Sequence, residues 1–175
     1  MNMMFPLSYG FILLNSFILH CVNLDSTYEK TIQAIQEINT GFYNAFESLS
    51  LESMEVIWKH SDDIVCIHPG WDLFSGWMAV RESWKTIFQN TERIKFIITN
   101  AKIRVFDNVI AVVVCLENIQ SNLNQSKSRI GVVSTNIFER QLAVDEYNNE
   151  HNEKWLMIHH HGSPVSDYIL PNVSI

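Results

Sequence analysis

Three consecutive histidines, residues 159–161, close the apolar run KWLMIHHH and are followed by Gly-Ser-Pro. Clustered imidazoles are typical of metal centres and of proton-transfer sites. Side chains of an extended strand alternate between its two faces, so we expect His159 and His161 on one face and His160 on the other. The three rings then cannot hold one metal ion, and no cysteine or carboxylate stands at a ligand spacing from them. We therefore predict no metal site.

The same alternation predicts two environments along this strand. It places Trp155 and Met157 on the face of His159 and His161, and it places Leu156 and Ile158 on the face of His160. We expect the second face to look into the protein, where His160 becomes a candidate ligand contact.

Four tryptophans within residues 58–84 could wall a site for a planar or apolar small molecule. They are Trp58, Trp71, Trp77 and Trp84. Trp77 and Trp84 lie one heptad apart, and tryptophans at a helical spacing are also typical of a packed core. Both interpretations stay open, and Trp58, Trp71 and Trp84 are kept as candidate ligand contacts. Arg81 could hold a ligand carboxylate at the rim of such a site, or it could lie on a solvated helix surface.

The composition indicates one acidic globular domain. The chain has 175 residues, of which 47% are hydrophobic, which is enough to bury one core. Lys and Arg total 12 against 19 Asp and Glu, a net charge of -7, so a nucleic-acid backbone would be repelled. Cys21, Cys66 and Cys115 have no metal or redox spacing and are predicted to be buried reduced thiols, which favours a reducing compartment. No GxSxG, GxGxxG, P-loop or HExxH motif is present, and no cofactor is predicted.

Residues 3–24 form an apolar segment without formal charge. It lacks basic residues at its start and a small-residue cleavage site, and polar residues dilute it. We interpret residues 1–25 as an extension, residues 26–167 as the domain and residues 168–175 as a tail. A cytoplasmic protein is expected, with secretion or membrane anchoring through residues 3–24 as the alternative.

Hydrophobic spacing predicts three helices. Ser26 and Glu29 form a capping box that should begin the first, which we expect to run to about Ser48. Its apolar stripe consists of Ile32, Ile35, Ile38, Phe42, Phe46 and Leu49. A shorter helix follows around Leu51, Met54, Ile57 and Trp58. A third should be capped by Ser75 and carries the stripe of Trp77, Val80, Trp84, Ile87 and Phe88.

The rest of the chain predicts strands. DDIVCIHPGW is a short strand stopped by Pro69-Gly70, and four β-rich runs follow residue 93. Asp107-Asn108 predicts a tight turn, whereas residues 120–127 and 142–153 predict polar loops. The strand from Val109 to Leu116 is apolar on both faces, so we expect its second face to be covered by another subunit.

Several stretches in this order, FYNAFESLSLESMEVIWKHSDDIVCIHPGW, GWMAVRESWKTIF, VVSTNIFER and WLMIHHHGSP, resemble the SnoaL-like branch of the nuclear transport factor 2-like superfamily. That superfamily also holds ketosteroid isomerase and the association domain of calcium/calmodulin-dependent kinase. The resemblance covers about residues 28–165. It implies an α+β fold, a cone-shaped barrel of a curved antiparallel sheet wrapped around three N-terminal helices. It also implies a homodimer with a pocket between helices and sheet, but no particular reaction.

The resemblance assigns roles to two further residues. His68, before Pro69, occupies the place of the isomerase's catalytic aspartate, and an unperturbed imidazole pKa of about 6.5 would suit a general base. The alternative is a histidine that bonds a neighbour at a strand end. Tyr43 lies near the place of the isomerase's oxyanion-binding tyrosine and is a candidate ligand contact, or packing. We therefore predict a cofactor-independent isomerase, cyclase or lyase for an apolar or aromatic molecule, with a non-catalytic binding or association domain as the alternative.

Overall fold

The computed structural model describes the backbone of residues 8–123, 126–144 and 151–166, and the side chains of residues 26–120, 130–142 and 153–166. The helices are α1 (Ser8–Glu47), α2 (Leu51–Glu55) and α3 (Trp77–Gln89). The strands are β1 (Val65–Ile67), β2 (Leu73–Ser75), β3 (Arg93–Phe106), β4 (Ile110–Leu123), β5 (Ser126–Val144) and β6 (His151–Pro164).

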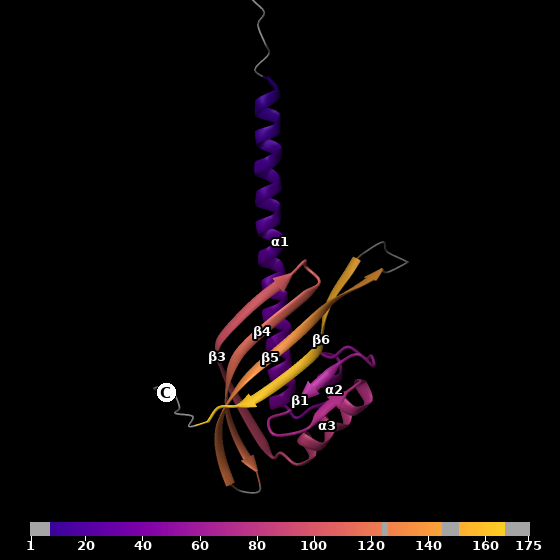
Figure 1. Ribbon diagram of the computed structural model, residues 1–175, viewed down its shortest axis with the longest axis vertical. Helices are drawn as coiled ribbons and strands as arrows, with labels where there is room; N and C mark the ends of the chain where they lie inside the picture. The colour runs from indigo at the N-terminus through magenta and orange to yellow at the C-terminus, as the bar shows by residue number, and fades with distance from the viewer. Residues whose placement is uncertain (1–7, 124–125, 145–150, 167–175) are drawn as a thin grey trace, which may run out of the picture.

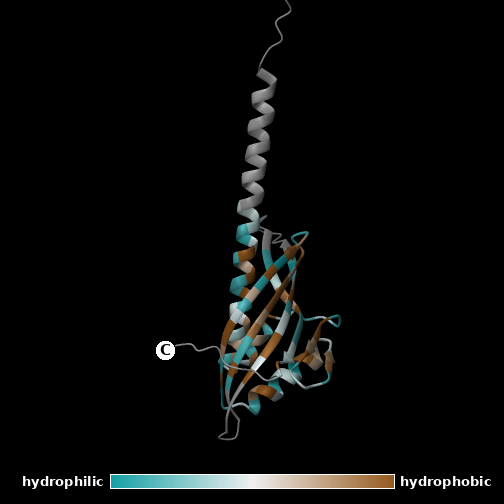
Figure 2. Ribbon diagram, turned by 60° about the vertical axis from the view of Figure 1, so that its left-hand side comes forward, coloured by the Kyte–Doolittle hydropathy of each residue, from teal (hydrophilic) through white to brown (hydrophobic). Residues whose placement is uncertain are grey.

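The six strands form one curved sheet in the order β2-β1-β6-β5-β4-β3. The helices lie on one face of it, behind the strands in Figure 1. Hydrophobic residues run along much of the long strands (Figure 2). The predicted α+β class is confirmed. The sheet is open, however, and β1 pairs with β6 in parallel because the chain leaves β1 through α3 before the antiparallel meander of β3 to β6.

Helix α1 does not begin at Ser26 as the capping box predicts. It runs continuously from Ser8, because no proline interrupts the chain between Pro6 and Ser26, and inside a helix the amides of Ser26 and Glu29 need no cap. Its end agrees with the prediction. Leu49 takes a left-handed φ of 52°, and the Leu49 amide closes a short turn on the carbonyl of Phe46. No helix within the described residues is both long and apolar enough to cross a membrane.

The start of α3 also differs from the prediction. Ser75 ends a short strand, β2, which pairs with β1 and is too brief to leave a pattern in the sequence. Gly76 precedes the helix with a φ of 79°, and no side chain caps α3. The Gly76 amide instead donates to the carbonyl of Ile64, 2.9 Å away. The residue before the helix is therefore a glycine with a positive φ, and the predicted serine cap is wrong.

The hairpins are longer than the polar composition of their connectors predicts. Asp107 and Asn108 have φ angles of 49° and 54°, which confirms a tight turn between β3 and β4. Of residues 120–127, expected to be a loop, residues 120–123 instead extend β4 to Leu123 and residues 126–127 begin β5 at Ser126. Continuous pairing of β4 with β5 satisfies the backbone hydrogen-bonding groups along this hairpin even where its side chains are polar.

A β-bulge in β6 changes which face several side chains occupy. Ile137 pairs with His159, but the next residue of β5, Phe138, pairs with Met157, so Ile158 is an extra residue. Trp155 and Met157 are consequently buried on the inner face together with His160, and not opposite to it as strict alternation predicts. His160 is 3% exposed, while His159 and His161 lie on the outer face, as predicted.

Candidate functional site

A cavity of about 400 Å³ opens between α1, α3, the segment after β1 and the inner face of the sheet. Most of its wall is apolar, and a few polar side chains converge on it. The lining residues are Phe46, His68, Pro69, Trp71, Thr86, Ile87, Asn90, Thr91, Ile94, Glu117, Ile119, Ile130 and His160. We call this the main cavity. Its size and lining suit a small, largely apolar ligand.

His68 follows β1 and is 3% exposed. Its Nε2 lies 2.8 Å from the hydroxyl of Ser83, which itself donates to the carbonyl of Val80 at 2.7 Å. Because the hydroxyl proton is already used, Ser83 accepts from His68 and Nε2 carries the proton. Burial lowers the pKa of His68 to about 4. The imidazole is therefore neutral at pH 7, and its pKa lies below the unperturbed value of about 6.5 that would suit a general base.

Pro69, which follows His68, lies close against Gly162 of β6. A Cβ added to Gly162 would lie 2.9 Å from Cγ of Pro69 and 3.1 Å from Cγ1 of Val132. Only glycine therefore allows the strand to approach the proline this closely. Gly162, the first residue after the three histidines, thus makes room for the proline that follows His68.

His160 reaches the main cavity from β6. Its Nδ1 lies 2.7 Å from Oδ1 of Asn136, whose Nδ2 donates to Oδ1 of Asn39 at 2.8 Å. In this arrangement the His160 proton sits on Nδ1. Burial, together with the charge of His68 in its protonated form, holds the pKa of His160 well below its usual range. Two neutral imidazoles, with ring centroids 6.3 Å apart, thus flank the cavity.

Glu117 is a site residue that the motif search does not single out. It is 3% exposed on β4, and its Oε1 accepts a 2.8 Å hydrogen bond from the hydroxyl of Tyr43. Burial raises the pKa of Glu117 to about 7. A signal for it exists in the sequence, because the apolar face of Ala111, Val113 and Cys115 continues to Glu117, which is a carboxylate on an inward-facing position.

Tyr43 stands behind the cavity wall and is not among its lining residues. Its hydroxyl also lies 3.2 Å from Ser134 Oγ and 3.2 Å from Cys115 Sγ. Burial, and then the charge of Glu117, raise the pKa of Tyr43 far above its ordinary value. Tyr43 therefore serves here as a neutral hydrogen-bond donor to Glu117. Cys66 and Cys115 are buried free thiols, as predicted, whereas the side chain of Cys21 lies outside the described residues.

The tryptophans divide between cavity and core. Trp71 is 43% exposed, lines the main cavity and meets the His68 ring edge-on at a centroid distance of 5.4 Å. Trp58 and Trp84, 1% and 0% exposed, are not among the lining residues and pack in the core. Trp77 stacks on His60 at 4.1 Å. Of the three tryptophans kept as ligand contacts, only Trp71 lies at the cavity.

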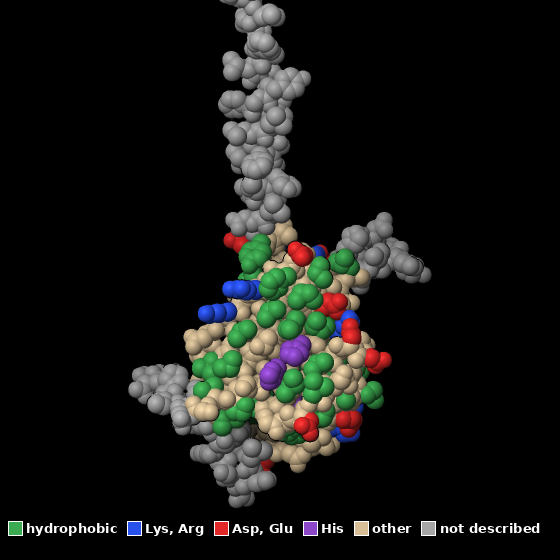
Figure 3. Space-filling view, viewed as in Figure 1, with side chains coloured by type: hydrophobic (Ala, Val, Ile, Leu, Met, Phe, Trp, Pro, Cys, Tyr) green, Lys and Arg blue, Asp and Glu red, His purple; other side chains and the backbone are tan. Residues whose placement is uncertain are grey.

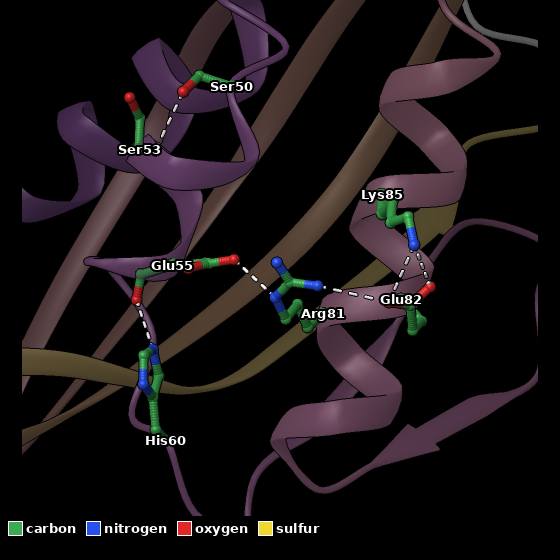
Figure 4. A network of polar contacts seen from close by, with 7 residues as sticks. All are labelled: Ser50, Ser53, Glu55, His60, Arg81, Glu82 and Lys85. Carbon is green, nitrogen blue, oxygen red and sulfur yellow. Dashed lines mark hydrogen bonds and ion pairs between the residues drawn. The ribbon is translucent and has the colours of Figure 1, made fainter.

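Arg81 is part of a surface network and does not reach the main cavity (Figure 4). Its Nε lies 2.6 Å from Oε1 of Glu55, which ties α3 to α2, and a second contact reaches Glu82 at 3.4 Å. Lys85 completes the network through Glu82. The guanidinium is therefore not available to hold a ligand carboxylate at the rim.

Three comparisons place this geometry among known proteins. A family model described as a SnoaL-like domain matches residues 35–167. The F-box protein SKIP8 of Arabidopsis thaliana is 30% identical over 142 residues, which is 81% of this chain and 54% of that protein, so the chain spans about half the length of this curated relative.

Two solved structures are similar. One is an NTF2-like family protein from Streptomyces avermitilis that is presumed to be a dehydratase. It is 31% identical, with a TM-score of 0.68 over 79% of this chain and 98% of that one. The other is the CaMKII hub of S. rosetta, 17% identical, with a TM-score of 0.58 over 76% of this chain and 95% of that one. The second likeness concerns the fold alone.

Proposed function

The chain belongs to the SnoaL-like domain family, and we propose that it binds an apolar or aromatic small molecule in the main cavity and transfers a proton to or from that molecule. The reaction class is that of a cofactor-independent isomerase, cyclase or lyase. One observation carries the proposal. Glu117, with a pKa of about 7, lines a largely apolar cavity together with His68 and His160, whose pKa values burial lowers so that both rings are neutral at that pH. The presumed dehydratase from Streptomyces avermitilis supports the same class.

The pKa of Glu117 suits proton transfer better than the pKa of His68, the residue to which the family resemblance assigns this role. A general base works best when its pKa lies near the working pH, and a pKa of about 4 makes His68 a weak base at pH 7. His68 carries its proton on Nε2, in the bond to Ser83, so Nδ1 is its acceptor nitrogen, and the Cys66 Sγ lies 3.9 Å from it. In this proposal Glu117 moves the proton, while His68 and His160 orient the ligand and Trp71 packs against it.

The test uses 2-tetralone, an apolar ketone with acidic α-protons, and follows exchange of these protons in D₂O by NMR. We expect the protein to accelerate exchange, and Glu117→Gln to lower the acceleration by about 10² to 10⁴-fold, the usual range for a general base. His68→Gln should have a smaller effect. Glu139→Gln is the matched control, since that carboxylate pairs with Lys59 away from the cavity.

Binding of 2-tetralone without accelerated exchange would refute proton transfer and leave the alternative, a non-catalytic ligand-binding domain. Loss of exchange in His68→Gln alone would return the role of proton carrier to His68. Absence of any 2-tetralone binding would contradict both ligand binding and proton transfer in the main cavity. Each outcome is read in the same titration, because ligand shifts and exchange rates come from the same spectra.

We further propose that a second copy of the chain covers the outer face of the sheet. This face carries exposed apolar side chains on three adjacent strands, including Ile97, Val114 and Val133 at 41%, 38% and 45%. Figure 3 shows hydrophobic side chains spread over it, with histidine among them and few charges at its centre. Apolar patches of this kind are typical of association surfaces.

Val133→Glu should therefore convert a dimer to monomers, because each interface would bury two unpaired carboxylates. Sedimentation velocity measures the change. Leu142→Glu is the control, since Leu142 is 66% exposed at the far end of β5 and pairs opposite Glu153. A wild-type chain that is already monomeric, or a Val133→Glu variant that remains a dimer, would show that this face is not the interface.

A further inference from the structure

A second cavity lies on the other side of Tyr43, between α1 and β3, with a volume of about 380 Å³. Its floor is apolar and includes Phe96, Ile98 and Ile103, while Asn39 and Asn44 face it from α1. The strand opens here because the register of β3 slips between Thr99 and Lys102, which brings Ala101 to the cavity rim. The proposed proton transfer makes no use of this space, which we call the β3 cavity.

The β3 cavity offers no unpaired charge. Glu47 is its one lining residue with a formal charge, and each of its oxygens already accepts a hydrogen bond. Oε2 accepts from Lys95, and Oε1 accepts from the backbone amide of Phe96 at 2.8 Å. Lys95 already neutralises the charge of Glu47, so an ion entering the cavity would lose its hydration for little electrostatic gain. The cavity therefore favours neutral molecules.

A buried chain of hydrogen bonds determines which polar group Asn39 presents to the cavity. Tyr43 gives its proton to Glu117, so the Tyr43 oxygen can only accept, and Nδ2 of Asn136 lies 3.5 Å from it. Nδ2 of Asn136 is thus the donor end, consistent with its 2.8 Å bond to Oδ1 of Asn39. Because Oδ1 of Asn39 accepts from Asn136, its amide nitrogen remains as a donor, and none of the described residues accepts a hydrogen bond from it.

We propose that the β3 cavity is a second ligand site, which takes a neutral small molecule whose carbonyl or ether oxygen accepts from the Asn39 amide. The apolar remainder of the ligand lies on Phe96, Ile98 and Ile103. An amide donor that is anchored from behind by Asn136 is already oriented, so the ligand does not need to order it on binding. The chemistry required is one acceptor and an apolar body, with no formal charge.

The test is an NMR titration with cyclohexanone, an acceptor on an apolar ring, against cyclohexylammonium chloride, a charged donor on the same ring. Cyclohexanone should shift the methyl signals of Ile98 and Ile103 and the side-chain amide of Asn39. A dissociation constant in the millimolar range is expected for a molecule of this size. Cyclohexylammonium should bind at least tenfold more weakly.

Three variants locate the binding. Ala101→Trp fills the rim of the β3 cavity and should abolish the shifts. Lys102 is next in sequence but pairs with Val114, whose side chain lies on the outer face of the sheet, so Lys102→Trp should leave the shifts unchanged. Asn39→Asp keeps an acceptor for Asn136 but removes the donor, and should weaken cyclohexanone at least tenfold. Thermal unfolding of each variant confirms that it is folded.

Several results would overturn the proposal. Shifts confined to Ile87 and Ile119 would place cyclohexanone in the main cavity, and equal binding by Ala101→Trp would exclude the β3 cavity. Unchanged binding by Asn39→Asp, or tighter binding of cyclohexylammonium, would refute the assigned ligand chemistry. A complete absence of shifts would mean that the cavity binds no ligand of this class. None of these results depends on whether 2-tetralone is turned over.

Discussion

Replacing Glu117 with glutamine should stabilise the protein by about 3 kcal/mol at pH 8 and leave its stability nearly unchanged at pH 4. Burial raises the pKa of Glu117 from 4.5 to about 7 in the folded protein. Between these two values the folded chain binds the proton and the unfolded chain releases it, so the carboxyl group lowers stability progressively as pH rises. Above pH 7 the loss is complete. Glutamine keeps an oxygen for Tyr43 and does not ionise.

Urea unfolding at a series of pH values measures this difference. The pH dependence of wild-type stability alone would not isolate Glu117, because the titration of His68 changes stability in the opposite direction. Its pKa falls from 6.5 to about 4 on folding, so its contribution to stability is lost as pH falls from 6.5 towards 4. The wild type minus variant difference removes the histidine terms. Glu139→Gln, at a carboxylate that pairs with Lys59 away from the cavity, is the control for replacing a carboxylate elsewhere in the sheet. A flat difference for Glu117→Gln would mean that its carboxyl group titrates normally.

The stability lost at Glu117 bears on the proposed function. A buried carboxylate without a cation costs free energy that an apolar side chain at the same position would not. Its partners, Tyr43 and Ser134, supply only neutral hydrogen bonds. A group held at a pKa near 7 in this way is typical of catalytic acids and bases. The variant that gains the most stability should therefore be the one that loses proton exchange.

Hydrophobic periodicity predicts most of this fold because the elements are long and amphipathic. The end of α1, the three helices and the Asp107-Asn108 turn all leave local patterns. The start of α1 and the strand β2 do not, since a capping box inside a continuous helix looks like one at a boundary, and a three-residue strand is shorter than any reliable period. Ile158 shows a third limit, because a bulge depends on pairing with β5 and is not encoded in β6 alone.

The site is less predictable than the fold, since burial determines its chemistry. His68 and His160 can be found by residue type and strand phase, but their low pKa values follow from enclosure by segments distant in sequence. To find Glu117 from the sequence, the alternation of inward-facing residues on β4 has to be continued two positions beyond Cys115. The tryptophans illustrate the same limit, because a helical stripe of aromatics does not reveal which ring meets the cavity.

Trp84→Ala should destabilise the protein by about 3 to 5 kcal/mol, the range for deleting a large buried aromatic side chain. Trp84 is fully buried, and its ring packs against Phe42, Phe46 and His68 at centroid distances of 5.6, 4.9 and 4.6 Å. Removing it leaves a void at the centre of the aromatic core, which the surrounding helices and sheet can fill only in part. Urea unfolding near pH 7 gives the loss directly.

Trp71→Ala is the matched comparison, and the two variants together separate core from cavity. Trp71 is 43% exposed, so its truncation should cost less than about 1 kcal/mol of stability, in keeping with surface substitutions. It should nevertheless weaken 2-tetralone, because an aromatic wall of the main cavity is lost. Equal stability losses in the two variants would contradict this division. So would a Trp71→Ala variant that binds 2-tetralone as the wild type does, since the ligand would then lie elsewhere.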